Sequence, residues 1–208
     1  MADPFAAKRR WMVERQLRPR GIRDEAVLRA MDRVPRELFV EEGLRDSSYV
    51  DGPLPIGRGQ TISQPFIVAY MTEALELSGR ESVLEIGTGS GYQAAVLAET
   101  AARVYTVEVI PELGAAARAL LEEQLGYRNV FFKVGRGQEG WSEHAPFDRI
   151  LLTAAPAAFP SGLFGQLAEG GIALAPVGLD GQRLVRYHKQ DGVVASDELI
   201  GVIFVPLV

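Results

Sequence analysis

The sequence predicts an α/β protein built on a doubly wound, mostly parallel sheet. Three observations carry this prediction. From residue 80 onward short apolar segments alternate with helical ones, which is typical of strand–helix–strand units. A glycine-rich turn at 87–91 joins the first such strand to its helix, as in nucleotide-binding sheets. The chain's 208 residues suit one domain. We expect N-terminal helices and a substrate loop over 1–79, a cofactor-binding core over 80–178 and a β extension over 179–208.

The first segment, residues 4–42, has apolar residues at helical spacing. Pro19-Arg20-Gly21 should divide it into two helices, with Asp24 capping the second. Seven basic side chains precede residue 24, namely Lys8, Arg9, Arg10, Arg15, Arg18, Arg20 and Arg23. Such a run can bind an acidic partner, but a solvated helix face is the simpler expectation.

The segment 43–65 carries four Gly and three Pro, so it should be mostly loop. Loops of this length in a compact domain are often functional. The polar cluster Gln60-Thr61-Ser63-Gln64 favours a functional loop over a simple connector. Pro65 should begin a helix reaching Leu77, with Ser63 or Gln64 at its N-cap.

The core alternates regularly. We expect strands at 82–86, 103–107, 129–134, 147–152 and 172–175, with helices at 94–100, 111–125 and 163–167. Gly126 should end the second of these helices, and Gly170-Gly171 the third. After residue 179 the chain is β-rich again, at 183–188 and 193–205. The Gln190-Asp191-Gly192 turn predicts a hairpin there.

The glycine turn indicates the kind of ligand. Gly87, Gly89 and Gly91 follow a strand and precede a helix, so free backbone N–H groups should face a ligand. The dinucleotide pattern would need a third glycine at Tyr92, and a phosphate loop would need Gly-Lys-Ser/Thr. No basic residue lies from Glu81 to Thr100 to meet a pyrophosphate.

Acids occupy the matching places instead. Glu85 lies in the strand, and Glu108 ends the next strand 23 residues later. A carboxylate at the second place can accept hydrogen bonds from both hydroxyls of a ribose. S-adenosyl-L-methionine, which has an adenosine, a sulfonium cation and no phosphate, fits such a pocket. A plain tight turn is the less favoured alternative.

Composition excludes several other chemistries. The chain has no Cys and only two His, His144 and His188, in separate parts of the sequence. Disulfides, thiolate metal sites and Cys nucleophiles are therefore excluded, and we expect no metal site. We expect both histidines to be structural or surface residues. The net charge of −5 disfavours general nucleic-acid binding. The sequence shows no apolar leader and no membrane-length apolar run, so we expect a cytoplasmic protein without membrane contact.

Several motifs together resemble the protein-L-isoaspartate (D-aspartate) O-methyltransferase family. VLEIGTGSGYQAAVLA is similar to its first cofactor motif, and LPIGRGQTISQP is similar to its own signature loop. The segments VPRELFV, VYTVEVIPEL, APFDRILLTAA, LAEGG and VIFVPL follow in the family's order. The resemblance therefore covers nearly the whole chain, and GQTISQP with LTAAP and FVPL makes it specific to this family.

The resemblance implies a Rossmann-like methyltransferase that transfers a methyl group from S-adenosyl-L-methionine. The acceptor would be the α-carboxylate of an L-isoaspartyl or D-aspartyl residue in a damaged protein, with repair following through a succinimide. A carboxylate is ionised at neutral pH, so the reaction needs alignment rather than a general base. We expect a monomer whose partners are isoaspartyl-containing proteins and peptides.

The matched positions imply roles. Ser63 would be the active-site hydroxyl that donates to the acceptor carboxylate, and a helix cap is its alternative role. The implied cofactor residues are Glu85, Gly87, Thr88, Gly89, Ser90, Gly91, Gln93, Glu108, Val109, Arg136, Gly137 and Thr153. Among them Glu85 would orient the loop and Glu108 would accept from the ribose hydroxyls. The implied substrate residues are Ile56, Thr61, Ile62, Gln64, Ala154, Ala155, Val205 and Pro206. Trp141 is most simply a packing residue.

One position departs from the family pattern. Where the family usually carries Gly-Asp-Gly, this chain has Gly135-Arg136-Gly137. Arginine cannot accept a hydrogen bond from the adenine amino group. Backbone groups should then recognise adenine, or Arg136 should stack on it or turn outward.

Three alternatives stay open at the level of sequence. A methyltransferase for a small carboxylate or hydroxyl compound would share the glycine motif without needing GQTISQP. A cofactor-binding protein without turnover is suggested only by Arg136. A nucleic-acid methyltransferase lacks its usual Asn/Asp-Pro-Pro-aromatic loop, because Thr153-Ala154-Ala155-Pro156 stands there.

Overall fold

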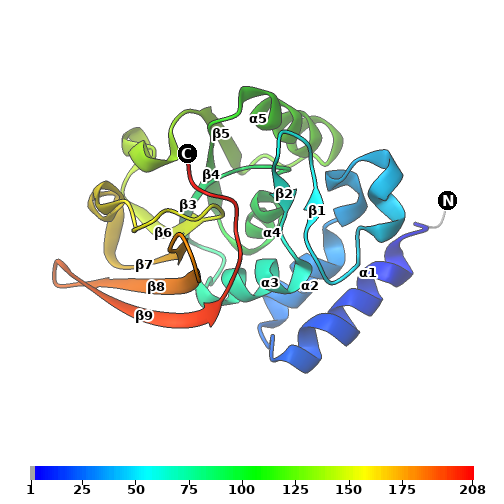
Figure 1. Cartoon of the computed structure of the whole chain (residues 1–208), viewed down its shortest axis with the longest axis horizontal. Coiled ribbons are helices and arrows are strands. Elements are labelled where there is room, and N and C mark those ends of the chain that lie inside the picture. The colour runs from blue at the N-terminus through cyan, green and yellow to red at the C-terminus, as the bar shows by residue number, and fades with distance from the viewer. Residues whose placement is uncertain (1–2) are drawn as a thin grey trace.

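A computed structural model describes residues 3–208 and contains a seven-stranded sheet in the order β5-β4-β3-β6-β7-β8-β9 (Figure 1). The five strands from β5 to β7 are parallel, and β8 and β9 continue the sheet antiparallel. The strands are β3 (Ser82–Ile86), β4 (Arg103–Glu108), β5 (Val130–Val134), β6 (Phe147–Leu152), β7 (Leu167–Val177), β8 (Arg183–Gln190) and β9 (Val193–Gly201). The predicted fold class is confirmed.

The strand order reverses between β3 and β6. The chain runs from β3 to β4 and β5 on one side, then crosses back to place β6 on the other side of β3. Loops leaving β3 and β6 therefore diverge, and a crevice opens at the carboxyl ends of these strands. Both sequence segments with the strongest chemical signal, 87–91 and 153–155, lie at this edge.

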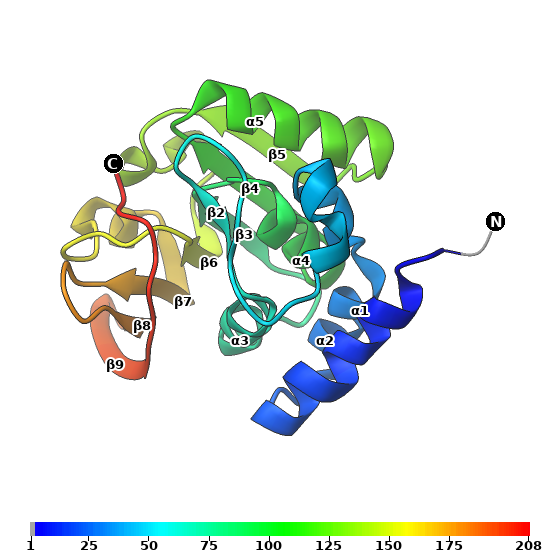
Figure 2. The same cartoon turned by 45° about the vertical axis from the view of Figure 1, so that its right-hand side comes forward.

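Helices cover one face of the sheet. They are α1 (Ala6–Met12), α2 (Glu25–Arg33), α3 (Pro65–Ala74), α4 (Tyr92–Thr100) and α5 (Pro111–Arg118). Figure 2 shows α1 and α2 on the far side of α4 from the sheet. Alternation along β3 sends Val83 toward these helices and Leu84 and Ile86 to the opposite face. Three short 3-10 helices, Gly137–Glu139, Ser142–His144 and Ser161–Gly165, flank that opposite face.

The N-terminal prediction holds in outline. α1 continues as a π-helical turn over Val13–Leu17 and a 3-10 turn over Arg18–Arg20, and Gly21 ends it with φ 95°. Asp24 caps α2 as predicted, because its carboxylate accepts from the backbone N–H groups of Ala26 and Val27.

Part of the basic run is paired with acids within residues 3–208. Lys8 pairs with Asp46 at 2.8 Å, Arg18 with Glu25 at 2.7 Å and Arg20 with Asp51 at 2.9 Å. Arg9 is buried. Arg10, Arg15 and Arg23 are exposed, so part of the run keeps its charge at the surface.

The predicted helix at 163–167 is wrong. A 3-10 helix occupies Ser161–Gly165, and β7 already begins at Leu167 and runs through Gly170-Gly171. The pairing of β6 with β7 shifts register between Phe147 and Arg149, and Gly170 has φ 75°. Glycine thus absorbs an irregularity inside the strand instead of ending a helix.

The other boundaries differ by a few residues. α3 ends at Ala74 rather than Leu77, and α5 gives way to a π-helical stretch over Ala119–Gln124. The tail hairpin forms as predicted, with Asp191 and Gly192 at φ 52° and 73° in a two-residue turn. No helix among residues 3–208 is long and apolar enough to cross a membrane.

The segment 43–65 is more ordered than a loop. It begins with a 3-10 helix (Glu42–Ser47) and then folds into a small hairpin of β1 (Leu54–Pro55) and β2 (Thr61–Ile62). Its tip has left-handed backbone from Gly57 to Gly59. Ile56, beside the tip, approaches Gly89, so the hairpin folds over the glycine turn after β3.

Candidate active site

Two hollows meet at the carboxyl edge of the sheet. The first is lined by Gln60, Thr61, Ile62, Ser63, Val68, Ile86, Gly87, Thr88, Gly89, Ser90, Tyr92, Gln93, Val107, Glu108, Val109, Ile110, Gly137, Thr153, Ala154, Val205, Pro206, Leu207 and Val208. The second is a groove lined by Pro53, Thr61, Ser63, Gln64, Ile67, Thr153, Gly181, Gln182, Arg183, Gly201, Val202, Ile203, Phe204 and Val205. Thr61, Ser63, Thr153 and Val205 form the wall that the two share.

The glycine turn leaves β3 in a conformation that favours glycine. Gly87, Gly89 and Gly91 have φ of 99°, 53° and 87°. A Cβ on Gly87 would lie 2.5 Å from Oγ1 of Thr153. That hydroxyl is 2.6 Å from the Gly87 carbonyl oxygen, so Thr153 fixes the start of the turn.

Gly91 has a different task from the one the resemblance implied. A Cβ there would lie 2.8 Å from Cδ1 of Leu121 and 3.1 Å from Cβ of Ala117. Gly91 therefore allows α4 to approach the helix after β4, and it is not part of the cavity wall.

Glu108 is held rigidly in the cavity wall. Its carboxylate accepts from the backbone N–H of Gly89 at 2.8 Å and from that of Ile110 at 2.9 Å. The residue is 6% exposed. Each carboxylate oxygen keeps a further lone pair, so the group can accept hydrogen bonds from a ribose diol.

The charge of the first cavity fits one class of cofactor. Within residues 3–208 its wall contains one acid, Glu108, and no Lys, Arg or His. A pyrophosphate would find no cation there, whereas a ribose and a sulfonium would find a carboxylate and a pocket of glycine backbone. The residues present therefore fit S-adenosyl-L-methionine. No group of three or more potential metal ligands occurs in the described chain.

Glu85 lies below the cavity rather than in its wall. It is fully buried and accepts from Oγ1 of Thr106 at 2.5 Å, and Thr106 in turn lies 2.6 Å from Oγ1 of Thr88 in the turn. Its other oxygen has no partner. Burial raises the pKa of Glu85 to about 8, with a smaller contribution from the nearby Glu108 carboxylate. Glu85 thus supports the turn through two threonines, which sequence reasoning could not specify.

Glu85 makes a testable contribution to the pH dependence of stability. In the unfolded chain it ionises near 4.5, but the folded protein keeps it protonated to a pKa of about 8. The stability from neutral Glu85 is present at acid pH and is lost as the pH rises through about 8. In Glu85→Gln the side chain stays neutral at every pH. The free energy of unfolding, measured with urea, should therefore fall less steeply between pH 6 and pH 9 in this variant than in the wild type. Parallel pH profiles would contradict this.

Ser63 lies between β2 and α3 and faces both hollows. No side chain caps α3, so the alternative role of Ser63 as a helix cap is not seen. Its backbone carbonyl accepts from Nη2 of Arg36 at 2.8 Å. Ser63 thus lies at the junction of the two hollows.

The remaining predicted residues divide between wall and support. Thr88, Ser90, Gln93, Val109, Gly137, Ala154 and Pro206 line the first cavity as well, and Gln64 lines only the groove. Ile56 packs on Gly89 instead of the groove, and Ala155 is bridged to Pro206. Arg136 is exposed and lines neither hollow, so it adopts the outward arrangement of those that the sequence left open. Its neighbour Gly137 lines the first cavity with backbone atoms.

The structure adds residues that sequence reasoning missed. Tyr92, Val68 and Ile110 line the cavity, and Arg183 and Ile203 line the groove. Nothing in the sequence marks the last two, because β8 and the C-terminal segment reach the groove only through sheet topology. Trp141 and His144 pack on the Tyr105 ring, and His188 lies outside both hollows.

A mostly parallel sheet with this strand order, a glycine turn after β3, an acid ending β4 and a cavity wall without cations together fit the class of Rossmann-like S-adenosyl-L-methionine-dependent methyltransferases. A family model described as Protein-L-isoaspartate(D-aspartate) O-methyltransferase (PCMT) matches residues 8–208. The chain belongs to this family.

Curated relatives match most of the chain or nearly all of it. A protein-L-isoaspartate O-methyltransferase of Picosynechococcus sp. is 55% identical over 206 residues, covering 99% of this chain and 92% of the relative. A Synechococcus sp. protein of the same name is 59% identical over 177 residues, covering 85% of this chain and 72% of the relative.

Solved structures agree as well. One solved protein-L-isoaspartate O-methyltransferase has a TM-score of 0.86 at 29% identity. The match covers 97% of this chain and 65% of that longer chain. A Plasmodium falciparum protein described as such an enzyme, in complex with S-adenosyl-L-homocysteine, has a TM-score of 0.81 at 25% identity and covers 96% of this chain and 97% of its own.

Proposed function

We propose that the two hollows bind the two substrates of an isoaspartyl carboxyl methyltransferase and that Ser63 lies at the point of transfer. The first cavity takes S-adenosyl-L-methionine and the groove takes an L-isoaspartyl or D-aspartyl residue of a damaged protein. The observation that carries this proposal is the shared wall of Thr61, Ser63, Thr153 and Val205.

The chemistry requires little from the protein. The cofactor supplies an electrophilic methyl group on sulfur, and as the acceptor carboxylate forms an O–C bond the S–C bond breaks and leaves a neutral thioether. The carboxylate is ionised at neutral pH, so no proton moves and no base is needed. The site's contribution is to hold oxygen, carbon and sulfur in line, which can lower the barrier by several kcal/mol.

Each residue then has a defined task. Glu108 accepts from the ribose hydroxyls, and the backbone of the turn from Gly87 to Ser90 surrounds the methionine end. The Ser63 hydroxyl donates to one carboxylate oxygen and directs the other toward the methyl group. No His or Asp lies beside Ser63 in either wall, so the hydroxyl has no partner that would make it a nucleophile.

The groove suits an extended peptide. Its lining includes Gly201, the last residue of the edge strand β9, and the segment 202–205 that follows this strand. Ala155 fixes this segment, because its N–H donates to the Val205 carbonyl and its carbonyl accepts from the Leu207 N–H.

A pair of synthetic peptides tests the function. One contains L-isoaspartate and the other normal aspartate at the same place, and methyl transfer is read as base-labile label released as methanol. We expect labelling of the isoaspartyl peptide alone. Equal labelling of both, or labelling of neither, would refute the proposed substrate; methylation of small carboxylates or hydroxyl compounds would instead support that alternative.

We also propose that the enzyme acts as a cytoplasmic monomer. The glycine turn, Glu108 and Ser63 all come from one chain, as a monomeric enzyme would require. Size-exclusion chromatography with light scattering tests the monomer, and fractionation of the source cells tests the compartment.

A further inference from the structure

A buried arginine lies behind the active site. Arg36, in the 3-10 helix Arg36–Phe39, is 0% exposed. Its Nε donates to the Ser48 carbonyl at 2.7 Å, and its Nη2 donates to the Ser63 carbonyl at 2.8 Å. Its guanidinium carbon lies 4.7 Å from the centre of the Tyr92 ring. One side chain thus contacts the acceptor side of the site and the residue that follows the glycine turn.

This arrangement is costly for the folded protein. None of the ion pairs within residues 3–208 includes Arg36, and its Nη1 has no hydrogen-bond partner. A buried cation without a carboxylate is unfavourable, and apolar residues often replace buried charges without loss of stability. Stability by itself therefore gives little reason for an arginine at this place.

The two contacts of Arg36 differ in how much they depend on it. Tyr92 is also held by an edge-on contact with Phe39, at 5.3 Å between ring centres, and by its hydroxyl near Sδ of Met31. Ser63 has no side-chain cap contact to α3, and its carbonyl bond to Arg36 is part-buried. Loss of the guanidinium should therefore release Ser63 while the cofactor side stays in place.

We propose that Arg36 is a positioning residue that sets Ser63 against the cofactor turn by bonding the Ser63 carbonyl while it packs on Tyr92. This inference rests on the proposed role of Ser63. Since transfer needs three atoms in line, a displacement of Ser63 by about 1 Å can cost on the order of 100-fold in rate.

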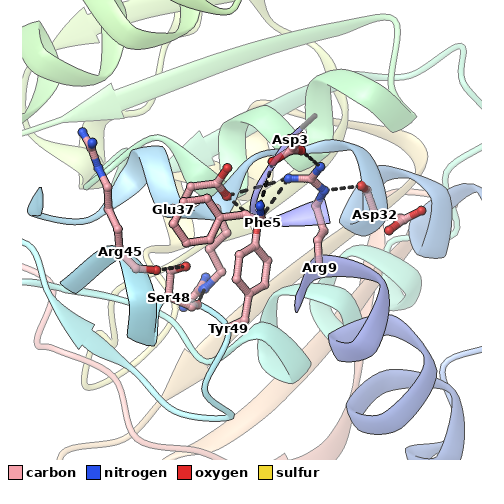
Figure 3. Close-up of polar contacts among 9 residues, drawn as sticks. Asp3, Phe5, Arg9, Asp32, Glu37, Arg45, Ser48 and Tyr49 are labelled. Carbon is pink, nitrogen blue, oxygen red and sulfur yellow. Dashed lines mark hydrogen bonds and ion pairs between the residues drawn. The ribbon is translucent and has the colours of Figure 1, made fainter. Parts of the chain in front are cut away.

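The chain offers a matched control in the same region. Arg9 is 8% exposed, and it donates to the Asp32 carbonyl and the Tyr49 hydroxyl and pairs with Asp3 (Figure 3). Neither Arg9 nor any of these three partners lines either hollow. Arg9 also lies 3.7 Å from Oε2 of Glu37, the residue next to Arg36, but it makes no contact with Arg36 or Ser63 among its hydrogen bonds and ion pairs. Arg9→Met removes a comparable buried guanidinium without touching Ser63.

The experiment compares Arg36→Met, Arg36→Lys, Arg9→Met, Ser63→Ala and the Arg36→Met/Ser63→Ala double variant. For each, kcat and KM are measured with the isoaspartyl peptide, the Kd for S-adenosyl-L-homocysteine by calorimetry, and the Tm by thermal unfolding. All assays are made well below the lowest Tm. Lysine keeps the charge and can reach one carbonyl, so it provides a folded variant should methionine prevent folding.

We expect kcat to fall about 10- to 100-fold in Arg36→Met and less in Arg36→Lys, with Kd for S-adenosyl-L-homocysteine within about threefold of wild type. Arg9→Met should lower Tm and leave kcat unchanged. Once Ser63 is alanine, the further loss from Arg36→Met should be much smaller, because both changes act on one interaction.

Three results would overturn the inference. They are an unchanged kcat in a folded Arg36 variant, an equal loss of kcat in Arg9→Met, or losses from Arg36 and Ser63 that multiply fully in the double variant. A wild-type enzyme that does not label the isoaspartyl peptide refutes the proposed function instead, so the two failures are distinguishable.

Discussion

Glu108→Ala is expected to weaken S-adenosyl-L-methionine binding about 100-fold or more. Hydrogen bonds to a charged group contribute about 1.5–3 kcal/mol each, and two ribose hydroxyls would lose their acceptor. The backbone N–H groups of Gly89 and Ile110 lose their partner as well, so the turn itself is less well fixed. Calorimetric titration with S-adenosyl-L-methionine measures the loss.

Glu112→Ala is the control for this change. Glu112 lies four residues further on, in the first turn of α5, and its exposed side chain pairs with Arg58 at 3.1 Å. The variant removes the same charge from the same region, but an exposed ion pair contributes at most about 1 kcal/mol. Its affinity should stay within about threefold of wild type. Similar affinities for the two variants would refute the assignment of Glu108 to the ribose.

Gly137→Ala should destabilise the protein by about 1–3 kcal/mol, the usual cost of overpacking a core. A Cβ at this place would lie 2.3 Å from Cγ2 of Ile86 and 3.3 Å from Cδ1 of Leu207. Ile86 is β-branched and 1% exposed in the central strand β3, so its methyl group cannot turn away. Urea unfolding measures the change, and cofactor affinity should fall too, because Gly137 lines the cavity.

Gly135→Ala, two residues earlier, is the control that separates crowding against Ile86 from the general effect of replacing a glycine. Its Cβ would lie 3.5 Å from Cε of Lys133, an ordinary contact with a flexible side chain. Neither glycine has positive φ, so the loss of glycine's flexibility is common to both variants and only the crowding differs. Gly135→Ala should change stability by less than about 0.5 kcal/mol. Equal destabilisation of the two would show that crowding against Ile86 is not the cause.

Local patterns predicted the central strands well. The strand at 82–86 and that at 147–152 have the predicted bounds, because buried parallel strands are short apolar runs between turn residues. The pattern failed at Gly170-Gly171, where two glycines can end a helix or bend a strand with equal ease. Only pairing with β6 selects the strand.

The candidate site was predictable to a similar degree. The glycines of the turn directly follow β3, and Glu108 ends β4. These residues could therefore be predicted from the strands that precede them in the sequence. Arg36 lies in VPRELFV, one of the segments that resemble the family, but nothing local indicates its contacts, because only folding brings Ser48 and Ser63 to it. Glu85 was expected to orient the turn. Its side chain lies on the helix side of β3 and supports the turn through Thr106 and Thr88, two partners that no local pattern indicates.

The sequence by itself determined the fold class, the family and the kind of cofactor, because strand periodicity, glycine spacing and the order of acids are local properties. Tertiary structure decided which residues meet: it joined the two hollows at Ser63, turned Arg136 outward, and placed Arg36 behind the Ser63 carbonyl. These contacts link segments tens of residues apart. Their geometry depends on how helices and strands pack, and no local pattern contains that information.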